Sequence, residues 1–115
     1  MEANLLERLN LLYDSGQIDP DVYEQIPVLV QRVEEHLQVK LDEEIGGPFI
    51  SHLSIALQRV KKQEAIQEAP EELKALSAKH PDLFGFAKEI LNSEEEAEAH
   101  FVTLYFCTLT GKGNE

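Results

Sequence analysis

Cysteine is nearly absent from this chain. Its 115 residues include one cysteine, Cys107, and a single thiol cannot form an internal disulfide. The amino-terminal residues also lack the basic segment and the apolar run of a secretory signal peptide. These two absences predict a cytoplasmic protein whose fold does not depend on disulfide bonds.

Positive charge is scarce as well. Ten lysines and arginines stand against 22 aspartates and glutamates, which gives a formal net charge of −12 at pH 7. Such a charge repels nucleic-acid phosphates and anionic lipid headgroups, so we expect no direct binding to nucleic acid. Apolar runs approaching the ~20 residues that span a bilayer are also missing, and we expect no association with a membrane.

What the sequence does contain is helical periodicity along nearly its whole length. Apolar residues recur at spacings of three and four, and no alternating pattern typical of β-strands competes with them. A length of 115 residues suits one domain with its own core. We therefore predict a single all-α domain over residues 1–115, a bundle of five helices with a core from residue 5 to residue 110 and a polar tail at residues 111–115.

Local signals predict where the first two helices begin and end. Gly16 suits the left-handed cap of a first helix over residues 5–13, and Asp19 followed by Pro20 is typical of the start of a second. Pro27 lies inside that second helix, where proline removes a backbone donor and crowds the preceding turn. It predicts either a bend or a restart of the helix.

The third helix has an interrupted beginning. Acidic residues at 42–44 suit a helix amino terminus, but Gly46, Gly47 and Pro48 follow, so we expect the firm helical part after Pro48. Residues 63–72 form a polar connection, in which Pro70 can open a short helix.

Two further helices are predicted near the carboxy terminus. One runs over residues 81–91, and the last begins at a capping box, in which the Ser93 hydroxyl and the Glu96 carboxylate each accept from the other's backbone N–H. We interpret the acidic run at 94–98 as helix initiation and a solvated face. Gly111 is the expected stop.

His52 is the most informative residue, because it places an ionisable ring in the apolar stripe of residues 49–59. At 100° per residue it lies about 60° from the direction of Phe49, so it borders the core. A histidine nitrogen can carry a transferred group. Arg59 falls on the same flank, about two turns later, where its guanidinium can approach an anion on His52. The same geometry also fits a plain border histidine beside an exposed arginine.

The order of residues 50–64, with His-Leu-x-x-Ala-Leu-x-Arg before Lys-Lys-Gln-Glu, resembles the first histidine motif of the phosphotransferase-system regulation domain, the PRD. Residues 9–18 look like the opening helix and turn of that domain, and residues 79–88 are similar to its fourth helix. The resemblance covers residues 5–110. It identifies the chain as similar to a single, stand-alone PRD of five helices.

The resemblance implies a regulatory module of bacterial sugar metabolism rather than an enzyme. Such domains commonly form homodimers, and phosphocarrier proteins of the phosphotransferase system phosphorylate their histidines. His52 matches the first of these histidines and is the phosphoacceptor candidate, with Arg59 as the candidate neighbour of the phosphate. We expect a transcription-regulator component that acts through protein partners, among them another PRD-containing regulator.

One departure from the family pattern concerns the second histidine. Family members carry it in the final helix, in an order like Tyr-Leu-x-Leu-His-Leu, and Tyr105 stands at that place here. His100 is nearby, but five residues along a helix turn it about 140° away, so it is not a simple substitute. The second phosphorylation site is therefore not carried over.

Other chemical candidates are weaker. The Glu-x-x-His spacing of di-iron bundles is missing, and we expect no metal and no cofactor. Cys107 has no base beside it in sequence and is interpreted as an inert thiol. Two alternative functions stay open. One is a non-phosphorylated dimerisation or scaffold module in which His52 only packs. The other, which lacks its expected neighbouring residues, is a histidine phosphotransfer domain or a small metal-dependent enzyme.

Overall fold

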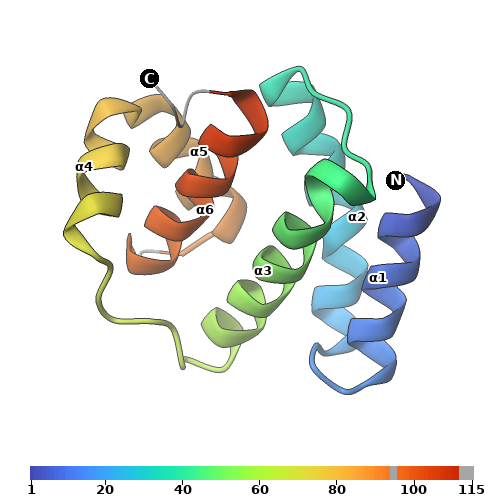
Figure 1. The fold of residues 1–115 in the computed structure, drawn as a ribbon. Helices are drawn as coiled ribbons and strands as arrows, with labels where there is room; N and C mark the ends of the chain where they lie inside the picture. Colours follow the sequence, from blue (N-terminus) through green and yellow to red (C-terminus); the bar gives the residue numbers. More distant parts are fainter. Residues whose placement is uncertain (94–95, 112–115) are drawn as a thin grey trace. The chain divides into compact units, whose positions relative to one another are not determined.

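The computed structural model describes residues 1–93 and 96–111, and these residues form six helices and no strand (Figure 1). The all-α class is therefore confirmed. The predicted count of five helices is wrong, because the short helix that Pro70 can open is present as a sixth, α4 (Glu71–Lys79).

The chain divides into two compact units, Met1–Gln58 and Arg59–Glu115. The first holds α1 (Ala3–Asp14), α2 (Pro20–Leu37) and most of α3 (Glu43–Lys61). The second holds the last turn of α3 together with α4, α5 (Pro81–Leu91) and α6 (Glu96–Thr110). The single domain over residues 1–115 stays a prediction.

In the first unit, α1 and α2 pack side by side (Figure 1). Glu2 caps the start of α1: its carboxylate accepts hydrogen bonds from the backbone N–H groups of Asn4 and Leu5 and so satisfies two donors of the first turn. Gly16 follows the helix with φ of +79°, as its sequence position predicts. The fully buried side chains come from all three helices of the unit and include Leu5, Leu9, Val22, Ile26, Val33, Phe49, Ile50 and Leu53.

Helix α2 runs through Pro27 without a break, so the alternative of a restart is wrong. Asp19 precedes its first turn, and the backbone N–H of Asp19 donates to the side-chain oxygen of Gln58 at 2.8 Å. The side chain of Gln58 is almost completely buried. This long-range bond fixes the start of α2 against α3.

Helix α3 begins at Glu43, earlier than predicted, and includes both glycines and Pro48. At both glycines a Cβ atom would come too close to neighbouring side chains. A Cβ atom at Gly46 would lie 3.1 Å from Leu41 Cβ, and one at Gly47 would lie 2.9 Å from Arg8 Nη2 and from Glu43 Oε1. The missing side chain at Gly46 thus leaves room for Leu41, just before α3, and the one at Gly47 leaves room for the contact of Arg8 of α1 with Glu43.

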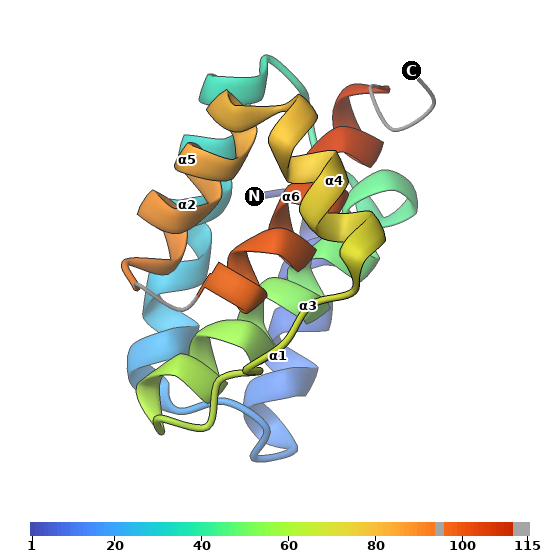
Figure 2. The same cartoon turned by 90° about the vertical axis from the view of Figure 1, so that its left-hand side faces the viewer.

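In the second unit, α5 packs against α6, and α4 packs against both (Figure 2). Phe86 and Phe106 meet across α5 and α6 with ring centroids 5.3 Å apart. The described part of α6 begins at Glu96, and residues 94 and 95 of the predicted acidic run lie outside the described residues. The interpretation of a solvated face is wrong for Glu98, whose side chain has no exposed surface.

Candidate functional site

His52 lies in the middle of α3, and its ring is half-buried. Its neighbour in sequence, Leu53, is fully buried. The histidine thus stands at the edge of the apolar stripe, where its helical position predicts it. Its Nε2 atom is buried, so a reaction at that atom requires local opening of the structure around it.

Arg59 lies in the last turn of α3 and forms an ion pair with Glu98 of α6. Its Nε donates to Glu98 Oε2 at 2.7 Å and its Nη2 donates to Glu98 Oε1 at 2.8 Å. The same carboxylate also accepts the backbone N–H of Ile66 at 3.1 Å. These hydrogen bonds to Glu98 raise the pKa of Arg59 above its already high ordinary value. Arg59 can therefore approach a phosphoryl group only by leaving a fully buried carboxylate.

His100 lies on α6 where side chains from α4 and α5 meet it. Its Nδ1 is 2.7 Å from Ser77 Oγ, and Ser77 is almost completely buried. The imidazole stacks on the Phe84 ring, with centroids 4.6 Å apart and 12° between the planes. Lys88 places its Nζ 4.9 Å from the centre of the same Phe84 ring, which is a cation–π distance. The contact with Ser77 of α4 and the stacking on Phe84 of α5 thus hold the His100 ring in one orientation.

Burial lowers the pKa of His100 below its ordinary value, because a partly desolvated ring disfavours the imidazolium form. Among the charges, Glu96 raises the pKa, whereas Lys74 and Lys88 lower it further. The neutral imidazole of His100 is therefore the favoured form near neutral pH.

Tyr105, one and a half turns after His100 on α6, is half-buried.

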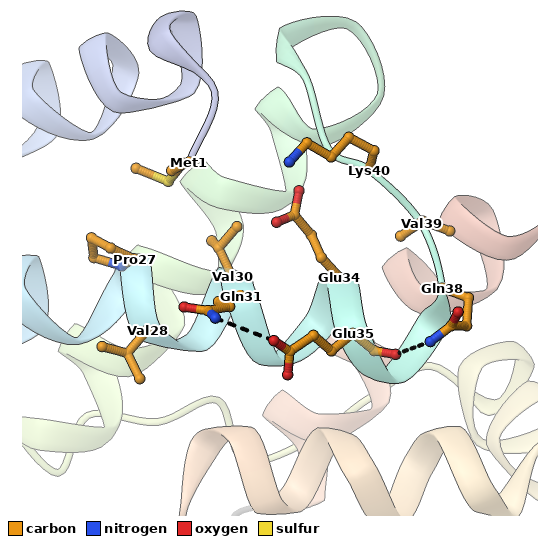
Figure 3. A pocket seen from close by; sticks show the side chains of 10 residues that line it. All are labelled: Met1, Pro27, Val28, Val30, Gln31, Glu34, Glu35, Gln38, Val39 and Lys40. Atoms are coloured by element: carbon orange, nitrogen blue, oxygen red, sulfur yellow. Dashed lines mark hydrogen bonds between the residues drawn. The ribbon is translucent and has the colours of Figure 1, made fainter.

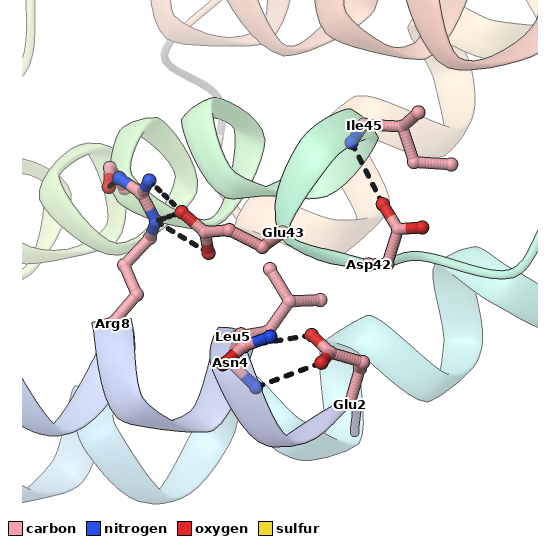
Figure 4. Close-up of polar contacts among 8 residues, drawn as sticks. Glu2, Asn4, Leu5, Arg8, Asp42, Glu43 and Ile45 are labelled. Carbon is pink, nitrogen blue, oxygen red and sulfur yellow. Dashed lines mark hydrogen bonds and ion pairs between the residues drawn. The ribbon is translucent and has the colours of Figure 1, made fainter.

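A polar network joins Arg8 of α1 to Glu43 and Ser51 of α3, and Figure 4 shows its Arg8–Glu43 part. Arg8 of α1 donates from Nε to both oxygens of Glu43, at 3.1 and 3.2 Å, forms an ion pair with Glu43 through Nη2, and donates from Nη1 to Ser51 Oγ at 2.9 Å. The hydrogen bonds to Glu43 raise the pKa of Arg8, and those from Arg8 lower the pKa of Glu43. This network ties α1 to the turn of α3 that precedes His52.

The family model of the PRD domain matches residues 28–107. The chain belongs to the PRD family. The match includes most of α2 and all of α3, α4 and α5, and it contains His52, Arg59, His100 and Tyr105. No curated protein and no solved structure matches the chain. Membership assigns a regulatory role linked to the phosphotransferase system and sugar metabolism.

The structure brings two of the predicted candidates into defined contacts. Arg59 meets Glu98, and His100 meets Ser77 and Phe84. Sequence reasoning missed all three partners, because each pair joins residues of different helices and no short spacing signals it. Helical spacing gave only the face on which Arg59 and His100 lie.

Two surface hollows of the PRD domain lie in its first unit. One, of about 800 Å³, has α2 on one side and Met1 and Lys40 on the other (Figure 3). Within it, Glu34 accepts the backbone N–H of Leu41 at 2.8 Å. The second, of about 570 Å³, borders Arg8, Glu43 and Ser51. Histidine lines neither hollow.

The described residues hold no cluster of three or more histidine, cysteine, aspartate or glutamate side chains placed for an ion. Cys107 is fully buried. In the part of the chain that the structure describes, none of the helices combines the length and the apolar character needed to cross a membrane.

Proposed function

We propose that this PRD domain is a cytoplasmic, non-enzymatic component of a sugar-responsive transcription regulator, and that phosphocarrier proteins phosphorylate it on His52. The family match over the histidine motif of α3 is the observation that carries this proposal. The half-buried position of His52 supports it, because a group with up to about two negative charges would act directly on the packing beside the core.

The proposed reaction exchanges one phosphorus–nitrogen bond for another. The lone pair of a neutral His52 nitrogen attacks the phosphorus of the donor phosphohistidine, and the bond between phosphorus and the donor ring breaks. The donor nitrogen keeps the electron pair of the broken bond, and its ring is left as an imidazole without the phosphoryl group. His52 ends with phosphorus on the attacking nitrogen and its proton on the other nitrogen, and no oxidant or cofactor takes part. Because Nε2 of His52 is buried, transfer to this atom requires transient opening of its surroundings. The transfer is therefore expected to be slower than transfer to an exposed histidine ring.

Arg59 is the proposed neighbour of the phosphoryl group, and Glu98 competes for it. Removing one partner of a buried ion pair costs about 3–5 kcal/mol, whereas an exposed pair returns about 0.2–1 kcal/mol. The phosphoryl group on His52 would therefore recruit Arg59 only together with a rearrangement that gives Glu98 another partner or water. Phosphorylation would in this way be coupled to the packing of the end of α3.

Pairing with a second copy, or with a PRD-containing regulator, is part of the same proposal. Large apolar side chains stand exposed on the first unit, most of all Leu11 at 64%, Val28 at 61% and Ile45 at 48%. Burial of such groups favours association. Light scattering after size-exclusion chromatography, with and without phosphorylation, tests this part and predicts a particle of twice the mass of the chain in at least one of the two states.

The phosphorylation is tested by incubation with phosphoenolpyruvate and the general phosphotransferase proteins, followed by peptide mass analysis under conditions that preserve phosphohistidine. His52→Ala tests the acceptor, and His36→Ala is its matched control because His36 is exposed on α2. Modification on the peptide that carries residue 52, lost in His52→Ala and kept in His36→Ala, supports the proposal. An unmodified residue 52 in the presence of charged phosphocarrier contradicts it.

A second function is favoured by a specific observation. Tyr105 replaces the family's second histidine, and Nε2 of His52 is buried, as expected for a module that only pairs or acts as a scaffold. In that case His52 is a packing residue. The scaffold function predicts that phosphocarriers leave every histidine unmodified while dimerisation persists.

A further inference from the structure

Leu11 of α1 is the most exposed large apolar side chain among the described residues, at 64%. It lines the hollow of about 570 Å³ in the first unit, and so does its buried neighbour Leu12. A single exposed leucine is ordinary on a protein surface. One that lines a hollow beside a buried apolar side chain offers a partner both a contact and a recess.

The hollow follows one face of α1. Its lining residues from this helix and its cap stand at positions 4, 7, 8, 11, 12 and 15, which are the spacings of neighbours on a helix surface. From Asn4 to Ser15 this face extends over roughly 16 Å at the helical rise. Gln17 and two residues of α3, Glu43 and Ser51, complete the lining. A partner helix of about three turns matches this length.

Negative charge flanks Leu11. Glu7 precedes it by four residues and Asp14 follows it by three, so both are its neighbours on the helix surface, and both are exposed. Among the described residues that line the hollow, Arg8 is the one cation, and Glu43 holds it in an ion pair (Figure 4). The surface around Leu11 therefore favours a group of positive charge.

The surrounding unit strengthens this preference. Residues 1–58 include eleven aspartates and glutamates but only three lysines and arginines. The negative charge of the chain is thus concentrated in the unit that carries the hollow. Such a field attracts basic partners from solution and repels acidic ones.

We propose that this hollow, lined by Leu11 and flanked by Glu7 and Asp14, docks an amphipathic helix of a partner protein that carries lysines or arginines beside its apolar face. An apolar side chain of that helix would enter the hollow against Leu11 and Leu12. Cations on its flanks would meet the two carboxylates. The proposal goes beyond the phosphorylation of His52 and does not depend on it, because none of these contacts involves that residue.

Charge also argues against a second copy of the chain as the occupant. A two-fold contact centred on Leu11 would bring Glu7 and Asp14 of each copy near the same carboxylates of the other, and like charges at an interface repel. Val28 and Ile45 are exposed as well and do not line this hollow. Pairing of two copies therefore has other apolar surface to use, and the hollow is assigned to an unlike, basic partner.

The test uses the full chain and three synthetic peptides of about 18 residues, a length at which helices form readily. The first has leucines on one helix face and lysines on the other. The second has glutamate in place of lysine, and the third has the composition of the first in an order that disperses the leucines around the helix. Isothermal titration calorimetry should show binding of the first peptide, weakened by salt, and roughly tenfold weaker binding of the other two.

Variants locate the contact. Leu11→Ser is expected to weaken binding of the lysine peptide about tenfold, because the apolar contact is lost. Val28→Ser is the matched control, since Val28 is almost as exposed, at 61%, and lies outside the hollow. It should leave the affinity unchanged. Glu7→Gln combined with Asp14→Asn is expected to weaken binding about threefold to tenfold.

NMR chemical-shift mapping on the unmutated chain locates the peptide without any variant, so a variant that fails to fold does not obscure the result. Shifts centred on residues 4–17, 43 and 51 support the proposal. Shifts centred on another acidic surface, or equal affinities of Leu11→Ser and the unmutated chain, overturn it. A dimer that Leu11→Ser dissociates, in a chain that does not bind the lysine peptide, also overturns it and assigns the hollow to a second copy. Labelling of His52 is measured separately, so failure of either proposal leaves the other standing.

Discussion

Arg59 donates two hydrogen bonds to the carboxylate of Glu98, at 2.7 and 2.8 Å, and the two side chains differ sharply in exposure. Arg59 keeps 29% of its side-chain surface exposed, whereas Glu98 keeps none. The charge of Arg59 can therefore reach water if its partner is removed, but the charge of Glu98 cannot. This asymmetry decides how the pair responds to substitution.

Arg59→Ala is expected to lower the free energy of unfolding by about 3–5 kcal/mol, because it leaves the buried carboxylate without its cation. Glu98→Ala is expected to cost clearly less, since the exposed part of Arg59 lets the guanidinium turn to solvent. Urea denaturation of both variants measures the difference. As a control, Lys74→Ala removes only exposed pairs and should change the free energy of unfolding by less than about 1 kcal/mol. Equal losses for the two Arg59–Glu98 variants would contradict the asymmetry.

Gly47 and Gly85 form a matched pair of glycines inside helices. A Cβ at Gly85 would meet no atom within 4 Å, so Gly85→Ala should raise the free energy of unfolding by about 0.5–1 kcal/mol through helix propensity. A Cβ at Gly47 would lie 2.9 Å from Arg8 Nη2 and Glu43 Oε1, and the pair would have to move. Gly47→Ala should therefore gain less than Gly85→Ala in thermal or urea unfolding. An equal gain would show that the ion pair moves aside without cost.

The Arg8–Glu43 pair predicts a pH effect of defined sign. Hydrogen bonds from Arg8 lower the pKa of Glu43 in the folded state. Its contribution to stability is therefore present above the unfolded pKa, about 4.3, and is lost as the pH falls through the lowered folded value. Carbon-detected NMR titration of Glu43 should give a midpoint that rises towards the ordinary range in Arg8→Ala. A midpoint that does not respond to Arg8→Ala would assign the shift to another group.

His100 provides a second titration, with a different cause. Burial lowers its pKa, and Lys74 and Lys88 add to the effect while Glu96 opposes it. The contribution of His100 to stability is therefore complete above the unfolded pKa, about 6.5, and is lost as the pH falls towards and through the lowered folded value. NMR of the imidazole should give a midpoint below about 6.5. His100→Gln should remove this part of the pH dependence of the urea midpoint, and an unchanged dependence would contradict the assignment.

Periodicity and caps were sufficient to predict the helices whose apolar stripes are long. Asp19 and Pro20 marked the start of α2, and Gly16 marked the turn before it. The sequence predicts α4 only as a short helix that Pro70 can open, outside the five of the bundle, because its few apolar residues lie between acidic and basic ones and it packs against α5 and α6.

The candidate sites were predictable only in part. Spacing along one helix put His52 at the border of the core, where it lies. The buried state of Glu98 was not predictable, because it depends on an arginine 39 residues away in sequence. The contact of His100 with Ser77 spans 23 residues and two helices, and no local pattern encodes it.

The central claim is that His52 accepts a phosphoryl group, and residue-resolved mass analysis after incubation with phosphoenolpyruvate and the general phosphotransferase proteins tests it most directly. The account predicts phosphohistidine on the peptide carrying residue 52, absent from His52→Ala and retained in His36→Ala. A residue 52 that stays unmodified while the phosphocarrier itself is charged would contradict it.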